Sequence, residues 1–147
     1  MNQRIILLVE DNPDDVKLTQ RAFNKSKFAE KISLEIVNNG NDAFDFLFGE
    51  GAYIYRNTRV MPVVILLDLN LPRINGFQIL ERIRADKRTK LIPVIILTSS
   101  NEENDIKKAY ALGANSYIRK PVDFKKFSIV ALQMGLYWVG LNEPPPS

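Results

Sequence analysis

The chain has 147 residues, of which 46% are hydrophobic and 25% are charged, so its size and composition are those of one globular domain with a full core. It contains no cysteine and no histidine, which excludes disulfides, thiol catalysis and imidazole chemistry on this chain. The net charge of +3 comes from scattered basic residues without a recognition motif, and we expect no nucleic-acid partner. No apolar run approaches the roughly 18 residues of a membrane span and no signal peptide is evident, so we expect a cytoplasmic protein without a membrane partner.

Three short apolar runs end abruptly in polar residues, which is typical of strands buried on both faces of a parallel sheet. A fourth run, residues 33–37, is shorter and more polar, as an edge strand would be. The predicted strands are residues 4–9, 33–37, 63–67, 93–97 and 116–119.

Helices are predicted between these strands. The first has Asn12 as its N-cap and Pro13 at its first position, and the fourth is expected to be capped by Asn101 and ended by Gly113. The others cover residues 41–48, 77–85 and 122–138, whereas residues 49–61 lack a clear period. Alternating strands and helices predict a doubly wound α/β fold. We expect a single domain over residues 1–147, with a core at 4–138, a tail at 139–147 and no output domain.

The carboxyl ends of parallel strands lie along one edge of the sheet, where ligands bind. Glu10, Asp11, Asp68, Thr98 and Lys120 all follow or close a predicted strand there. Two carboxylates about 4 Å apart repel by roughly 4 kcal/mol at an effective dielectric constant near 20, so the cluster requires a cation. Hard oxygen donors with open positions suit Mg²⁺ or Mn²⁺, and the added lysine and hydroxyl suit phosphoryl transfer onto a carboxylate.

Each of these residues, taken alone, also has an ordinary structural explanation. Asp11 could be an acid at a helix start, as Asp14 and Asp15 are expected to be, and Asp68 could be a turn residue. Thr98 could cap a strand, and Lys120 could be a solvated charge. Their joint occurrence at the strand ends, in the right order, favours the functional interpretation.

The phrases LLVEDNPDD, ILLDLNLPRINGFQIL, IPVIILTSS and GANSYIRKP resemble the receiver domain of two-component response regulators, and the likeness runs from about Arg4 to Tyr137. The resemblance implies a flavodoxin-like, five-stranded parallel sheet in the order 2-1-3-4-5. It also implies a cis peptide bond between Lys120 and Pro121, a geometry that costs little before proline.

The resemblance further implies a role for each site residue. Asp68 would be the phosphoacceptor, and Thr98 and Lys120 would hold the phosphoryl oxygens. Thr98 and Tyr117 would form the switch. The metal ligands would be Asp11 directly, Glu10 through water, Asp68, and the backbone carbonyl of Asn70.

The chain is most similar to the stand-alone regulators that are paired with cyanobacterial or bacterial phytochromes. We therefore expect it to accept a phosphoryl group from a histidine kinase, with a phytochrome as the candidate donor, and to catalyse only its own phosphorylation and dephosphorylation. Because it has no histidine, the donor must lie on another chain or be a small acyl phosphate. Apolar residues outside the core stripe of the last helix, such as Leu132, Leu136 and Tyr137, predict a homodimer through helix four, strand five and helix five.

Three alternatives stay open at this point. A flavodoxin-like cofactor binder shares the topology, but the acidic loop after the first strand would repel phosphate. A phosphatase with Asp68 as nucleophile would need a second acid where Asn70 stands. The third alternative is a degenerate receiver that acts only as a binding module, against which the intact site argues.

Overall fold

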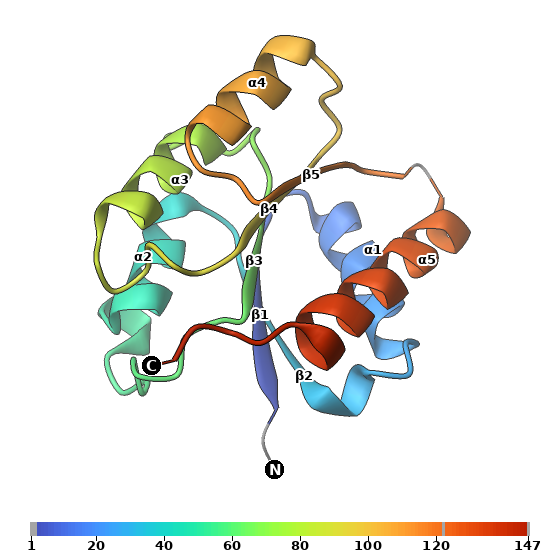
Figure 1. Ribbon diagram of the computed structural model, residues 1–147, viewed down its shortest axis with the longest axis horizontal. Coiled ribbons are helices and arrows are strands. Elements are labelled where there is room, and N and C mark those ends of the chain that lie inside the picture. The colour runs from blue at the N-terminus through green and yellow to red at the C-terminus, as the bar shows by residue number, and fades with distance from the viewer. Residues whose placement is uncertain (1–2, 122, 147) are drawn as a thin grey trace.

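A computed structural model describes residues 3–121 and 123–146 of the chain. Its five strands form one parallel sheet in the order β2-β1-β3-β4-β5, which confirms the predicted fold class and places β2 at an edge (Figure 1). The strands are β1 (Arg4–Val9), β2 (Ile32–Val37), β3 (Val64–Leu67), β4 (Val94–Thr98) and β5 (Ser116–Arg119). The helices are α1 (Pro13–Asn24), α2 (Gly40–Phe48), α3 (Gly76–Ala85), α4 (Glu103–Ala111) and α5 (Phe124–Met134).

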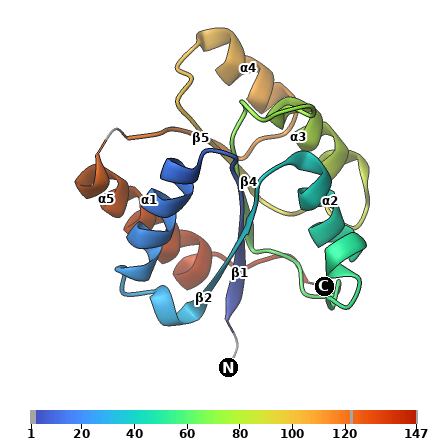
Figure 2. The same cartoon turned by 180° about the vertical axis from the view of Figure 1, so that it is seen from behind.

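The helices cover both faces of the sheet. Helices α1 and α5 pack on one face and α2, α3 and α4 on the other (Figures 1 and 2). Alternate side chains of each central strand serve the two faces, since Leu7 and Val9 contact the α2–α3 side while Ile6 and Leu8 contact the α1–α5 side. All four are essentially inaccessible to solvent, and burying a side chain of this size contributes about 1.5–3 kcal/mol. This explains why the strands are continuous apolar runs.

The strand register determines which polar residues meet at the carboxyl edge. Val9 pairs with Leu67, so the next residues, Glu10 and Asp68, leave the sheet side by side. Thr98 pairs with Arg119, which places Lys120 just past the end of β4. Residues that are far apart in sequence are therefore brought to one spot by the pairing of the strands.

Helix α4 begins differently from the prediction. Its N-cap position is Glu102, without a side-chain hydrogen bond, so the expected cap at Asn101 is wrong. Ser100 takes the local hydrogen bonds instead: its hydroxyl accepts from the Glu102 N–H at 3.3 Å and donates to Asp105 at 2.7 Å. A short hydroxyl side chain thus replaces the amide that we expected in that role.

The last helix extends the core beyond the predicted boundary at residue 138. Helix α5 ends at Met134 and continues as a π-helix over Gly135–Leu141. Val139 within it is only 7% exposed and joins the core on the α1 side. Trp138 is half-buried and packs edge-on against Tyr137, with ring centroids 4.8 Å apart.

The Lys120–Pro121 peptide bond is trans, so the cis isomer expected from the resemblance is wrong. The two isomers of a bond before proline differ by only about 0.5–1 kcal/mol, so the sequence of the two residues does not decide between them. Across residues 3–121 and 123–146, no helix has the length and apolar character needed to cross a membrane.

Candidate functional site

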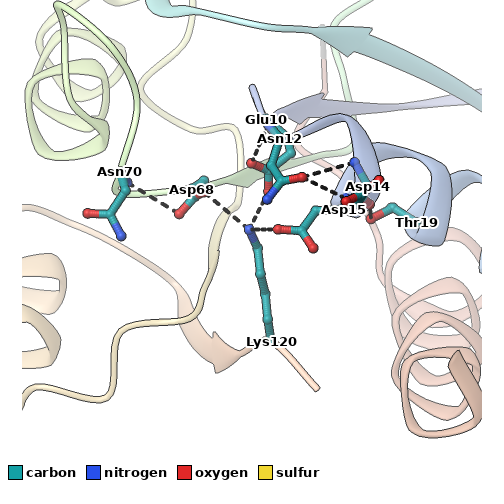
Figure 3. A network of polar contacts seen from close by, with 8 residues as sticks. All are labelled: Glu10, Asn12, Asp14, Asp15, Thr19, Asp68, Asn70 and Lys120. Carbon is teal, nitrogen blue, oxygen red and sulfur yellow. Dashed lines mark hydrogen bonds and ion pairs between the residues drawn. The ribbon is translucent and has the colours of Figure 1, made fainter. Parts of the chain in front are cut away.

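Glu10, Asp68 and Lys120 meet at the carboxyl edge of the sheet (Figure 3). Each is fixed by its position directly after a strand. The backbone N–H of Asp68 donates to the carbonyl of Val9 at 3.2 Å, and that of Lys120 donates to the carbonyl of Thr98 at 2.8 Å. The ladder bonds of the sheet therefore continue into the site and hold these residues in place.

Three carboxylates are arranged as a cation site. Glu10, Asp11 and Asp68 each offer an oxygen, and these three oxygens lie within 4.8 Å of one another. Glu10 and Asp68 are buried, with 1% and 6% exposure, whereas Asp11 is exposed, so the cluster has a protected side and an open side. This donor set fits Mg²⁺ or Mn²⁺, which bind one or two carboxylates and keep several waters. Asn70 lies beside the cluster, where its backbone N–H donates to Asp68 at 3.3 Å, and the metal role of its carbonyl stays a prediction.

Lys120 binds three carboxylates at once. Its Nζ donates to Glu10, to Asp15 at 2.8 Å and to Asp68 at 3.2 Å, so each of the three ammonium N–H groups has an anionic acceptor. Burial alone would lower the pKa of Lys120. The hydrogen bonds to Asp15 and Glu10, together with the charge of Asp68, outweigh burial and raise this pKa above its usual value. Lys120 is therefore a permanent positive charge at the site.

Glu10 is the carboxyl group most affected by burial. Removal from water raises the pKa of Glu10 from 4.5 to about 7, and the nearby charge of Asp68 acts in the same direction. The hydrogen bond from Lys120 and that from the backbone N–H of Asn12 oppose this rise without cancelling it. A bound divalent cation would stabilise the ionised form of this carboxyl.

Asp15 is a site residue that the sequence did not reveal. We expected it, like Asp14, to be only an acid in the first turn of α1. The Asn12 cap accepts hydrogen bonds from the N–H groups of both residues, but only Asp15 also reaches Lys120 (Figure 3). No periodicity marks it, and no local pattern links it to Lys120, which lies 105 positions further along the chain.

Thr98 contributes a buried hydroxyl at the end of β4. Its side chain is fully buried, and among the described residues its Oγ1 has no hydrogen-bond partner. A buried polar group without a partner costs about 1–3 kcal/mol, so such a group requires an explanation. A hydroxyl of this kind, at the end of the strand next to β3, fits an anionic oxygen that binds at the site.

Tyr117 connects β5 to the segment between Thr98 and α4. It lies in β5, is half-buried against the α3–α4 side of the core, and its hydroxyl donates to the carbonyl of Ser100 at 3.0 Å. Burial is the main reason that the pKa of Tyr117 is raised. The hydrogen bond ties β5 to the segment that follows Thr98, and the switching role of Tyr117 stays a prediction.

Gly76 allows the start of α3 to approach Asp68. A Cβ atom at this position would lie 2.3 Å from the carbonyl oxygen of Asp68, which no side chain could tolerate without a backbone shift. The N–H of Gly76 donates to the carbonyl of Leu69 at 3.0 Å, and Asn75 and Gln78 form a capping box around the helix start. The loop after Asp68 is thereby folded tightly against the site.

Comparison with known proteins agrees with this geometry. Residues 6–131 match the family described as the response regulator receiver domain, and the chain belongs to that family.

Among curated proteins, it is 37% identical to the probable methanogenesis regulatory protein FilR2 of Methanothrix harundinacea, over 96% of this chain and 87% of that protein. It is 34% identical to the response regulator Rcp1 of Synechocystis, over 92% of this chain and 89% of Rcp1. The Mn²⁺-bound structure of Rcp1 superposes with a TM-score of 0.85 at 33% identity, covering 97% and 99% of the two chains. The phosphorylated cyanobacterial phytochrome response regulator RcpA superposes with a TM-score of 0.87 at 34% identity, again covering 97% and 99%. The chain is thus related to phytochrome response regulators.

Proposed function

We propose that this chain is a cytoplasmic, stand-alone response regulator that accepts a phosphoryl group on Asp68 from a histidine kinase in a Mg²⁺-dependent reaction. The observation that carries the proposal is the environment of Asp68. This buried carboxylate lies close to two further acids and to the ammonium group of Lys120. The neighbouring strand ends in Thr98, whose hydroxyl has no hydrogen-bond partner among the described residues. Charge stabilisation and positioning of this kind are what phosphoryl transfer requires.

In the proposed reaction, an oxygen of Asp68 attacks the phosphorus atom of a phosphohistidine on the kinase. The new P–O bond forms as the P–N bond breaks, and the electron pair of that bond stays with the imidazole of the donor. Lys120 orients the phosphoryl oxygens and screens their charge, and Thr98 donates its hydroxyl hydrogen to one of them. When bound by Glu10, Asp11 and Asp68, a divalent cation would neutralise charge on the transferred group.

The product would carry about two negative charges where Asp68 carried one, together with new hydrogen-bond acceptors. We propose that Thr98 moves toward these acceptors and that Tyr117 follows. This would change the surface formed by α4, β5 and α5. The hydrogen bond from Tyr117 to Ser100 supports such coupling, because Ser100 is only two residues beyond Thr98.

Two partners follow from this function. The kinase is proposed to be of the phytochrome type, which rests on the likeness to RcpA and Rcp1. The second partner is another copy of the chain, bound through α4, β5 and α5. Exposed apolar side chains along α5 and the π-helix support it, namely Ile129, Leu132, Leu136, Tyr137 and Leu141.

Asp68→Asn tests the proposal directly. The variant should lose labelling by radioactive acetyl phosphate with Mg²⁺, and by a panel of phosphorylated histidine kinases that includes phytochromes, because the amide cannot accept the phosphoryl group. Asp14→Asn is the matched control, since it removes an equal charge from an exposed position nearby and should label like the wild type. Full stoichiometric labelling of Asp68→Asn would refute the assignment.

A further inference from the structure

The proposed chemistry leaves one contact of the site without a role, the ion pair between Lys120 and Asp15. The two groups are 2.8 Å apart, and their side chains are 9% and 29% exposed. An ion pair this well shielded is stronger than an ordinary surface pair, because water screens it less.

The three acceptors of Lys120 differ in their other commitments. Glu10 and Asp68 bind Lys120 and also belong to the set of carboxylates that can hold a cation. Asp15 binds Lys120 but, within the part of the chain that the structure describes, it is not in that set. Among residues 3–121 and 123–146, Lys120 is the one side chain that bonds to the Asp15 carboxylate. This contact would stay available when Glu10 and Asp68 bind a cation and Asp68 is phosphorylated.

Asp15 is also held on a rigid element. It lies in the first turn of α1, whose start is fixed by the Asn12 cap, and its carbonyl accepts a hydrogen bond from the buried hydroxyl of Thr19 at 2.7 Å. Lys120, in contrast, carries its charge on a flexible four-carbon stem. An anchor on α1 would therefore limit where that charge can move.

We infer that Asp15 is a positioning residue for phosphoryl transfer. It holds the Nζ of Lys120 beside Asp68 while Glu10 and Asp68 bind the cation and Asp68 accepts the phosphoryl group. This inference rests on the proposed function and adds to it a residue that acts through Lys120. It predicts that Asp15 affects the rate of transfer only when Lys120 is present.

The contact is tested first without metal or phosphodonor. Urea unfolding in EDTA is measured for the wild type, Asp15→Asn, Lys120→Met and the double variant. Asp15→Asn should raise the equilibrium constant for unfolding about fivefold more in the wild type, where Lys120 is present, than in the Lys120→Met variant. Equal effects in both backgrounds would overturn the inference.

The role is tested by phosphorylation with phosphoramidate at saturating Mg²⁺. Asp15→Asn should lower the maximal rate about tenfold relative to Asp14→Asn, which corresponds to about 1.4 kcal/mol, and the half-saturating Mg²⁺ concentration should match that of the control. In the Lys120→Met background, Asp15→Asn should cause no further loss.

Three results contradict the inference: a maximal rate equal to that of Asp14→Asn, an equal loss in both backgrounds, or a change confined to the Mg²⁺ requirement, which would place Asp15 in the metal site. Failure of the wild type to label would instead defeat the proposed function, so the two failures are distinguishable.

Discussion

At the scale of single residues, Glu10 has two candidate roles that protonation of its carboxylate at acid pH would oppose. It is a candidate metal ligand and an acceptor for Lys120, and both roles require the ionised carboxylate. Burial nevertheless raises the pKa of Glu10 to about 7, so without a cation this group binds a proton more readily in the folded protein than in the unfolded chain. A cation that binds this carboxylate would therefore compete with the proton.

This gives a prediction for stability against pH in the absence of metal. Between about pH 4.5 and pH 7, folding takes up a proton at Glu10, so its contribution to stability is complete below pH 4.5 and is lost as the pH rises through 7. Glu10→Gln removes this titration while keeping the shape of the side chain. Between pH 5 and pH 8, the free energy of unfolding of the wild type should fall by on the order of 1–3 kcal/mol more than that of Glu10→Gln, as measured by urea unfolding in EDTA.

The other shifted groups do not interfere in this range. The pKa of Asp86 lies near 2 because Arg88 hydrogen-bonds to it, and the pKa of Lys120 lies above its usual value. Parallel stability curves for the wild type and Glu10→Gln would show that Glu10 ionises normally, and would contradict the burial argument.

At the scale of elements, local sequence patterns were enough to predict the central strands and the start of the first helix. The apolar runs located β1, β3 and β4, and the pair Asn12 and Pro13 located the start of α1. Because strand ends define the site, Glu10, Asp68 and Lys120 could be predicted together. Parallel pairing, rather than any local signal, then brought them into contact.

The features that could not be predicted from the sequence depend on contacts between distant parts of the fold. Asn101 looked like a helix cap, but Ser100 takes those hydrogen bonds and its carbonyl also accepts from Tyr117, a residue of another strand. The extension of the last helix past residue 138 depends on Val139 reaching the core. The pairing of Asp15 with Lys120 joins residues 105 positions apart, and no pattern within α1 encodes it.

The start of α3 yields a prediction about a close backbone approach. Gly76→Ala should destabilise the protein by about 1–3 kcal/mol and slow phosphorylation, because its Cβ would displace the backbone of Asp68. Gly140→Ala is the control: its Cβ would meet the Phe28 ring at 3.4 Å, an ordinary contact, and should change stability by no more than about 0.5 kcal/mol. Urea unfolding and labelling kinetics measure both effects, and equal stabilities for the two variants would contradict the steric argument.

At the scale of the whole molecule, the site and the apolar side chains of the surface proposed for self-association lie in different parts of the fold. The acids and Lys120 lie at the carboxyl edge of the sheet, whereas the exposed apolar side chains lie on α5 and on the π-helix that follows it. In the proposed mechanism, the signal would pass from the strand ends through Thr98 and Tyr117 to reach that surface. Substitutions on the surface should therefore test the proposed association without touching the site.

Leu132→Glu should weaken the proposed dimer. Leu132 is 39% exposed on α5, so a charge there should leave the fold intact but oppose burial against a second copy. Light scattering with Mg²⁺ and beryllofluoride should give a dimer for the wild type and a monomer for this variant. Leu91→Glu makes the same change at a residue that is 65% exposed and outside α4, β5 and α5, and should still dimerise. A wild type that stays monomeric at high concentration, with and without beryllofluoride, would remove the dimer from the proposed function.

Trp138 gives this arrangement a built-in optical reporter. It is the one tryptophan of the chain, and it stands half-buried beside Tyr137 on the segment proposed for self-association. The emission colour of an indole depends on the polarity around it, so a partner that covers this segment would shift the fluorescence of unlabelled protein. A change confined to the strand ends would leave the spectrum as it was. Stopped-flow fluorescence could therefore time the arrival of the signal at the surface separately from the chemistry that starts it.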